Sequence, residues 1–176
     1  VGFVGKNQAT PILLKGLLRL EYRGYDSAGI GIRSGENDIR IIKTQGRIEA
    51  LIKKTHKETA LGNCGIGHTR WATHGAPSER NAHPQTSDDG EVALVHNGII
   101  ENHEELRQQL IKHGYAFHSE TDTESAANLL SYYLKLHKFC PIASILAFMQ
   151  RARGAYALAI LFKRCPGEIY VLRKES

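Results

Sequence analysis

One polar segment of the chain concentrates side chains that could bind a small charged ligand. In chain order these are His68, Thr69, Arg70, Trp71, Thr73, His74, Asn81 and His83. The planar guanidinium of Arg70 can hold a carboxylate through two parallel hydrogen bonds, and Trp71 could wall a small pocket. These residue types fit an anionic or zwitterionic ligand. They fit equally well a solvated loop in which Arg70 pairs with a surface acid.

Two shorter patterns further along the chain have a structural and a chemical interpretation. Asn97 and Gly98 follow an apolar stretch, and an Asn amide together with a Gly backbone N–H can donate to one developing oxyanion. The same pair is common in hairpin turns, and without further context the turn is favoured. Asp122 stands in the first turn of an expected helix, where it could bind a substrate ammonium or only complement the helix dipole. The pattern alone favours the dipole role.

The cysteines and histidines do not form a metal-site pattern. Cys64, Cys140 and Cys165 are widely spaced, and the chain has no Cys-x-x-Cys and no histidine pair at i, i+4. Cys64 lies inside an expected strand, which is typical of a buried, unreactive thiol. We therefore expect neither a metal nor a disulfide framework.

Length and composition are those of an ordinary globular protein. The chain has 176 residues, of which 41% are hydrophobic and 23% charged, and this suits one compact domain. The net charge is +5, but the basic residues are scattered and form no continuous run. No apolar stretch approaches the ~20 residues that a membrane span needs. We expect a cytoplasmic protein that binds neither nucleic acid nor a membrane.

Strands and helices are expected in an irregular order. The strands are expected at residues 1–5, 27–32, 39–42, 62–69, 92–95, 155–162 and 169–172, and the helices at 10–20, 47–55, 102–113, 121–137 and from 141. The first strand is expected to be buried, and Thr10 before Pro11 indicates the start of the first helix. Thr121 and Glu124 form a capping-box pattern. This order favours a layered α+β fold over a doubly wound parallel sheet.

Four longer motifs indicate a family. In chain order they are LLRLEYRGYDSAGI (17–30), GIGHTRWATHGAPSERNAHP (65–84), VHNGIIEN (95–102) and SETDTE (119–124). Together they resemble the glutaminase domain of the glutamine–fructose-6-phosphate aminotransferases, a class II glutamine amidotransferase family. Other class II amidotransferases, such as amidophosphoribosyltransferase, resemble the chain more weakly. The resemblance implies an N-terminal nucleophile hydrolase fold, a four-layer α/β/β/α sandwich with two packed antiparallel sheets.

The family's nucleophile is a cysteine at the mature N-terminus, within Cys-Gly-Ile-Val-Gly. This chain opens with Val1 and Gly2, which match the end of that motif. The resemblance therefore implies that residues 1–176 are a glutaminase domain truncated at both ends, without the sugar-isomerase domains and inactive as it stands. The terminal position matters because an α-amine, with an ordinary pKa of ~7.7 to 8.0, can act as general base. Cys64 has an amide nitrogen and cannot take over this role.

The resemblance also implies roles for individual residues. Arg70 is expected to bind the glutamine α-carboxylate, and Asp122 its α-ammonium. The Asn97 side chain and the Gly98 N–H are expected to form the oxyanion hole. The remaining residues expected around bound glutamine are Arg23, Trp71, Thr73, His74 and His83.

These roles imply a protein that hydrolyses glutamine and passes the ammonia to fructose 6-phosphate, giving glucosamine 6-phosphate. No metal or organic cofactor is expected in this half, and the parent protein is expected to be a homo-oligomer. Two alternatives remain open. One is a glutamine-binding module that has lost its nucleophile, and the other is a class II amidotransferase with another acceptor.

Overall fold

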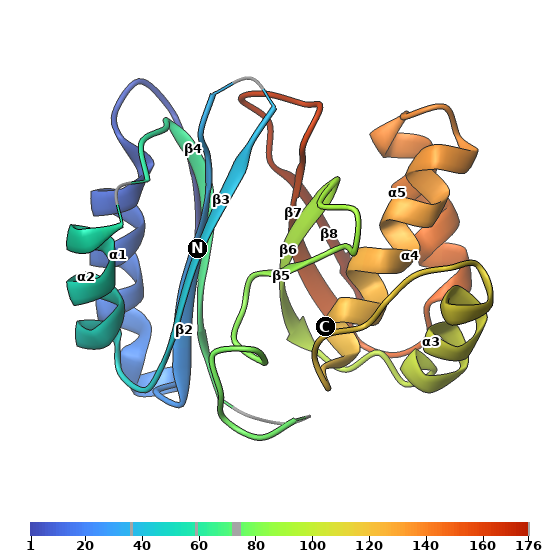
Figure 1. Cartoon of the computed structure of the whole chain (residues 1–176), viewed down its shortest axis with the longest axis horizontal. Helices are drawn as coiled ribbons and strands as arrows, with labels where there is room; N and C mark the ends of the chain where they lie inside the picture. The colour runs from blue at the N-terminus through green and yellow to red at the C-terminus, as the bar shows by residue number, and fades with distance from the viewer. Residues whose placement is uncertain (36, 59, 72–74, 176) are drawn as a thin grey trace.

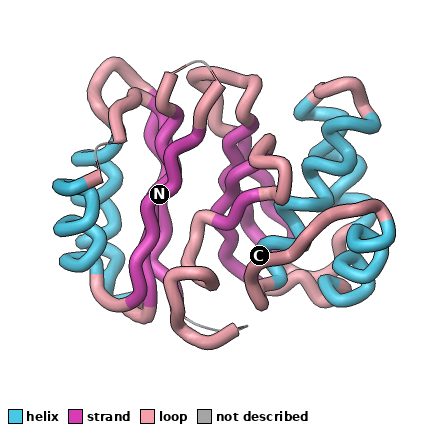
Figure 2. Tube along the Cα trace, viewed as in Figure 1, coloured by secondary structure: helices cyan, strands magenta, loops and turns pink. Residues whose placement is uncertain are grey.

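The chain folds into four layers, with helices on the outside and two antiparallel sheets inside (Figures 1 and 2). This architecture is seen in a computed structural model, which describes residues 1–35, 37–58, 60–71 and 75–175. The predicted α+β sandwich is confirmed. No helix in these ranges is long and apolar enough to cross a membrane.

The first sheet has the strand order β1–β4–β2–β3, and all neighbours are antiparallel. Its strands are β1 (Gly2–Val4), β2 (Ser27–Arg33), β3 (Ile39–Gln45) and β4 (Cys64–Arg70). Its outer face is covered by helices α1 (Ala9–Leu20) and α2 (Ile48–Lys57), and a short 3-10 helix, η1 (Glu21–Arg23), follows α1. Strand β2 is buried along its whole length because helices cover one face and the second sheet covers the other.

The second sheet has the order β5–β6–β7–β8, again antiparallel throughout. Its strands are β5 (Gln85–Thr86), β6 (Val92–Gly98), β7 (Tyr156–Phe162) and β8 (Tyr170–Lys174). Its outer face is covered by helices α3 (His103–Lys112), α4 (Asp122–Leu136) and α5 (Pro141–Arg151). Helix α4 is the most deeply buried of the three because α3, α5 and β6 all pack against it.

A small apolar cluster holds the two sheets face to face. Its buried members are Cys64, Ile66, Ala93, Val95 and Leu161. The prediction that Cys64 is buried in a strand is confirmed, and this burial raises the pKa of the thiol. The cluster also places β4 beside β6, so that the ends of these strands, Arg70 and Gly98, line one cavity.

Two expectations about the N-terminal region are wrong. Strand β1 is not buried: it is an outer strand of its sheet, and its first and last residues are exposed. The first helix begins at Ala9, with Gln8 in the N-cap position. The Thr10 hydroxyl does not cap this helix because it donates to the distant carbonyl of Ala60 at 2.7 Å.

Candidate active site

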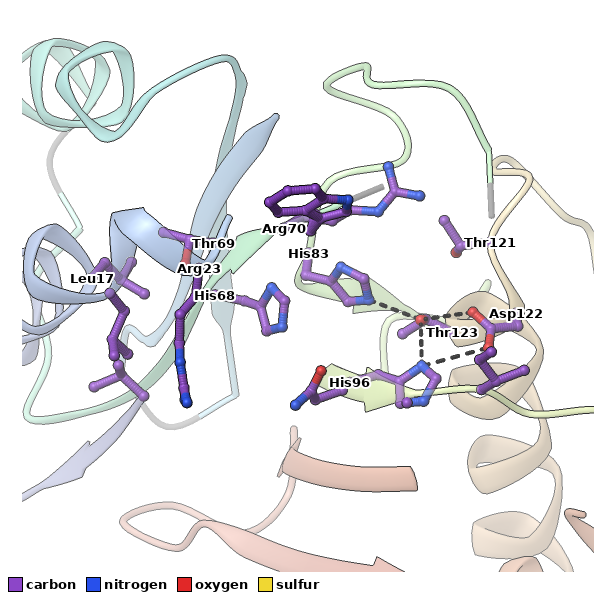
Figure 3. Close-up of a pocket in the computed structure, with 16 residues that line it drawn as sticks. Leu17, Arg23, His68, Thr69, Arg70, His83, His96, Thr121, Asp122 and Thr123 are labelled. Atoms are coloured by element: carbon purple, nitrogen blue, oxygen red, sulfur yellow. Dashed lines mark hydrogen bonds and ion pairs between the residues drawn. The ribbon is translucent and has the colours of Figure 1, made fainter. Parts of the chain in front are cut away.

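A cavity of about 530 Å³ lies where β4 and β6 end and α4 begins (Figure 3). Its lining includes Val1, Arg23, His68, Arg70, Trp71, His83, His96, Asn97, Gly98, Asp122 and Thr123. This set contains every described residue to which the resemblance gave a role, namely Arg23, Arg70, Trp71, His83, Asn97, Gly98 and Asp122. Asn81, a candidate from the polar segment, does not line the cavity. Thr73 and His74 lie outside the described residues.

Arg70 is the last residue of β4, and only 3% of it is exposed. Its Nη2 donates to the carbonyl of Gly75 at 3.0 Å. Burial lowers the pKa of Arg70, whereas the carboxylates of Asp26 and Asp122 act to raise it. Because arginine keeps its proton in proteins, the cavity holds a permanent cation within electrostatic reach of Asp122.

Asp122 is the first residue of α4, and it is also buried, with 5% exposed. Thr121 caps the helix, since its hydroxyl accepts from the N–H of Glu124 at 3.3 Å. The Asp122 Oδ2 accepts a 3.0 Å hydrogen bond from the N–H of Ile100, which follows β6 in the chain. The carboxylate therefore links the start of α4 to the segment after β6, which goes beyond the dipole role favoured by the pattern alone.

Asn97 and Gly98 form the exposed end of β6. They pair with Ala157 and Tyr156 of β7. The prediction of a hairpin turn, which the Asn-Gly pattern alone favoured, is therefore wrong. Gly98 has a φ of +123°, and a Cβ at this position would lie 2.2 Å from the carbonyl oxygen of Ala155. Glycine is required here, because other residues avoid this backbone conformation and a side chain would clash.

Three histidines converge between the two sheets and α4. The ring centroids of His68 and His83 are 4.8 Å apart, and those of His83 and His96 are 6.4 Å apart. Burial lowers the pKa of His68 to about 3 and that of His83 well below its usual range. Both rings are therefore neutral at pH 7.

Thr123 joins two of these histidines to the carboxylate. Its Oγ1 lies 2.8 Å from His83 Nε2 and 3.0 Å from His96 Nδ1. The resemblance gave no role to His68, His96 or Thr123, although each belongs to one of the four motifs. Of the three, only His68 was among the candidates of the polar segment. Among the described residues, no group of three or more His, Cys, Asp or Glu side chains could hold a metal ion.

Trp71 and Arg23 form an exposed part of the lining. Trp71 is 60% exposed, and its ring meets that of Tyr25 edge-on, with 5.6 Å between centroids. The Arg23 guanidinium lies over the Tyr22 ring, 5.8 Å from its centroid. Arg23 is exposed as well, so solvent reaches both side chains, in contrast to Arg70 and Asp122.

Val1, the residue before β1, lines the cavity. Its amino group donates to the carbonyl of Gly67 at 2.8 Å, and the Gly67 N–H donates to the Val1 carbonyl at 2.8 Å. These bonds continue the register in which Gly2 stands opposite Ile66. Gly2 faces Ile169, in the segment between β7 and β8, and the Val1 side chain faces Gly16 of α1.

Comparisons with known proteins identify the family of the chain. The sequence model of a glutamine amidotransferase domain matches residues 68–175. Curated relatives include glutamine–fructose-6-phosphate aminotransferases (isomerizing) of Legionella pneumophila strain Paris, 49% identical, and of Caldanaerobacter subterraneus subsp. tengcongensis, 52% identical. Each alignment covers 100% of this chain but only 29% and 28% of those proteins, so the chain spans less than a third of their length.

Solved structures give the same result. A glutamine phosphoribosylpyrophosphate amidotransferase from B. subtilis, in complex with ADP and GMP, matches with a TM-score of 0.77 and 32% identity, over 92% of this chain and 34% of that one. A structure described as the allosteric regulatory enzyme of purine biosynthesis matches with a TM-score of 0.79 and 32% identity, over 92% of this chain and 35% of that one. The chain belongs to the glutamine amidotransferase domain family.

Proposed function

We propose that this chain is the glutaminase part of a protein that hydrolyses glutamine and passes the ammonia to fructose 6-phosphate, forming glucosamine 6-phosphate. Family membership supports the glutaminase activity, and the names of the relatives support this acceptor. The observation that carries the proposal is the presence of Arg70 and Asp122, two buried side chains of opposite charge, in one cavity. We further propose that the parent protein is a cytoplasmic homo-oligomer, as the resemblance implies.

The two charges fit the two charges of a free amino acid. The Arg70 guanidinium can hold an α-carboxylate through charge-assisted hydrogen bonds, and the Asp122 carboxylate can accept from an α-ammonium. Because both side chains are anchored, their separation is fixed, and this selects an amino acid over a simple amide. In this pose the side-chain amide of glutamine extends toward Asn97 and Gly98.

We place the attacking sulfur on a cysteine three positions ahead of Val1, as in the family's Cys-Gly-Ile motif. Continuing the register of β1 with β4 puts that residue opposite Arg70, roughly 10 Å beyond Val1. Side chains alternate along a strand, so it would face the same side as Gly2, between the two sheets. That side borders the cavity that Asn97 and Gly98 line.

The proposed reaction is acyl transfer. The α-amine of the terminal cysteine takes the thiol proton, and the thiolate attacks the carbonyl carbon of the glutamine side-chain amide. The Asn97 amide and the Gly98 N–H donate to the oxyanion of the tetrahedral intermediate. The C–N bond then breaks, and ammonia leaves with the proton that the amine had taken. Water attacks the resulting thioester, which releases glutamate and restores the thiol.

The test is ammonia release from glutamine by the chain with Cys-Gly-Ile added ahead of Val1. The matched controls are the chain without the extension and the chain with Ala-Gly-Ile. We expect turnover only with the cysteine, and equal turnover in all three proteins would overturn the mechanism. Glutamine binding without hydrolysis in the Cys-Gly-Ile protein would favour the glutamine-binding module instead. The acceptor is tested by giving the full-length protein fructose 6-phosphate and assaying glucosamine 6-phosphate.

A further inference from the structure

The hydroxyl of Thr123 is the meeting point of the polar side chains in the cavity floor (Figure 3). His83 and His96 contact it at the distances given above, and its third contact is Asp122 Oδ1 at 3.4 Å. Thr123 itself is completely buried. Its partners come from the loop before β5, from β6 and from α4, so this one oxygen joins three separate parts of the fold.

Proton counting fixes the direction of these hydrogen bonds. A threonine hydroxyl has one proton to donate and two lone pairs to accept with, whereas a carboxylate only accepts. The 3.4 Å contact with Asp122 can be a hydrogen bond only if Thr123 donates, so we assign the Thr123 proton to Asp122. With this assignment, both imidazole nitrogens that face the hydroxyl bring their own protons. His83 is consequently the Nε2–H tautomer, and His96 carries a proton on Nδ1. His83 Nδ1 is buried and has no hydrogen-bond partner in the described part of the chain, so no acceptor there would stabilise a proton on Nδ1.

We propose that Thr123 is a positioning residue that sets the orientation of the Asp122 carboxylate and the tautomers of His83 and His96. The carboxylate is then held at both oxygens, at Oδ2 by the Ile100 N–H and at Oδ1 by Thr123. A carboxylate fixed in this way meets an ammonium without first having to reorient. The effect on substrate binding rests on the proposed function, in which Asp122 binds the α-ammonium of glutamine.

The first test uses the 176-residue chain and requires no activity. Nitrogen-15 NMR of the imidazole rings at pH 7 should show His83 as one tautomer, protonated at Nε2. Thr123→Val removes the hydroxyl at nearly constant volume and should shift the ring-nitrogen resonances of both His83 and His96, whereas Thr123→Ser should retain them. A wild-type His83 protonated at Nδ1, or spectra unchanged in Thr123→Val, would overturn the proposal. The wild-type spectrum decides even if the valine variant does not fold.

The second test is kinetic and uses the Cys-Gly-Ile protein. Thr123→Val should raise the KM for glutamine about tenfold or more, with a smaller change in kcat, because a hydrogen bond to a charged group is lost. Thr123→Ser should restore most of the affinity. The matched control is Ser125→Ala, since the Ser125 hydroxyl is buried in the same helix and has no hydrogen-bond partner in the described residues.

The two tests separate the two proposals. An unchanged KM in Thr123→Val would show that the hydroxyl does not position Asp122 for the substrate. If no variant hydrolyses glutamine and the tautomers still respond to Thr123, the proposed function fails, and the role of Thr123 in fixing the two histidines stands.

Discussion

Two parts of the cavity lining are positioned by different forces. Its buried network consists of Arg70, His83, His96, Asp122 and Thr123, all of which are less than 6% exposed. Its exposed strand end consists of Asn97 and Gly98, the last residues of β6, together with Ile99, which follows the strand. Side-chain hydrogen bonds between distant segments hold most of the network, such as the bond from the Ile100 N–H to Asp122. Arg70 instead donates to the nearby carbonyl of Gly75. Backbone pairing with β7 holds the strand end, together with the bond from the Ile99 N–H to the Ala155 carbonyl.

In the proposed function, this difference separates the residues that bind the substrate from those that take part in the reaction. A substitution in the buried network removes a partner that another buried group needs, so it is expected to affect both substrate affinity and stability. A side-chain substitution at the exposed strand end leaves the backbone in place, so it is expected to affect only the reaction. Gly98 is the exception, because there the backbone itself requires the absence of a side chain.

The largest effect is expected at Asn97. In the Cys-Gly-Ile protein, Asn97→Ala should lower kcat by about 10²- to 10³-fold, the usual result of losing one oxyanion donor. Because Asn97 is exposed, the free energy of unfolding should change by less than about 0.5 kcal/mol. Steady-state kinetics and urea unfolding measure the two quantities, and Asn37→Ala is a control at an exposed asparagine outside the cavity. An unchanged kcat would remove Asn97 from the oxyanion hole.

A smaller effect, and a different kind of effect, is expected at Asp122. Asp122→Asn keeps an oxygen that can accept from the Ile100 N–H but removes the negative charge. The KM for glutamine should rise by about 30-fold or more, because the substrate ammonium would be left without its charged partner. Asp38→Asn neutralises an exposed carboxylate outside the cavity and serves as the control. A variant with normal glutamine affinity would refute the role of Asp122.

Gly98→Ala tests the backbone requirement of the strand end. The residue's φ of +123° and the 2.2 Å approach to the Ala155 carbonyl both oppose a side chain. The free energy of unfolding should fall by about 1 to 3 kcal/mol from backbone strain, and further from the clash. Gly90→Ala is the matched control: Gly90 also has a positive φ, +70°, but open space around its Cβ position. Equal losses in the two variants would show that the clash is unimportant.

The smallest expected effect is a loss of stability in acid that comes from the histidines. The folded pKa of His68 is about 3, below its ordinary value, so the unfolded chain binds more protons as the pH falls through about 6.5. Between pH 7 and pH 5, His68 should lower the free energy of unfolding by on the order of 1 kcal/mol. Asp89, whose pKa is lowered to about 2, contributes stability that is lost only at lower pH, where its carboxylate becomes protonated.

Urea unfolding at pH 7, 6 and 5 measures this dependence. His68→Gln should make the decrease shallower, and an identical slope in the variant would contradict the assignment to His68. Asn97→Ala should leave the slope as in the wild type, since the strand end has no titratable side chain.

Features that depend on nearby residues could be predicted from the sequence. Thr121 caps α4 as its pattern indicates, and Pro141 begins α5, because each of these signals acts within one helical turn. Glu124 departs from the expected capping box, since it accepts from the N–H groups of His118 and Ser119 instead of that of the capping residue.

Features that depend on distant residues could not be predicted in the same way. The Asn-Gly pattern favoured a hairpin turn because a local pattern contains no information about pairing with β7, about 60 residues further along the chain. The contacts of Thr123 with His83 and His96 span 40 and 27 positions, and only the packing of both sheets against α4 brings them together. The residues named from the resemblance line one cavity, but the resemblance did not give the contacts that orient them.

The central claim is that Arg70 and Asp122 together recognise the two charges of an amino acid. Calorimetric titration of the chain with L-glutamate, glutarate and 4-aminobutyrate tests it directly, because glutarate lacks the α-ammonium and 4-aminobutyrate lacks the α-carboxylate. L-Glutamate should bind at least about 30-fold more tightly than either analogue, since each analogue leaves one buried charge unpaired. Equal affinity for all three ligands would contradict the account.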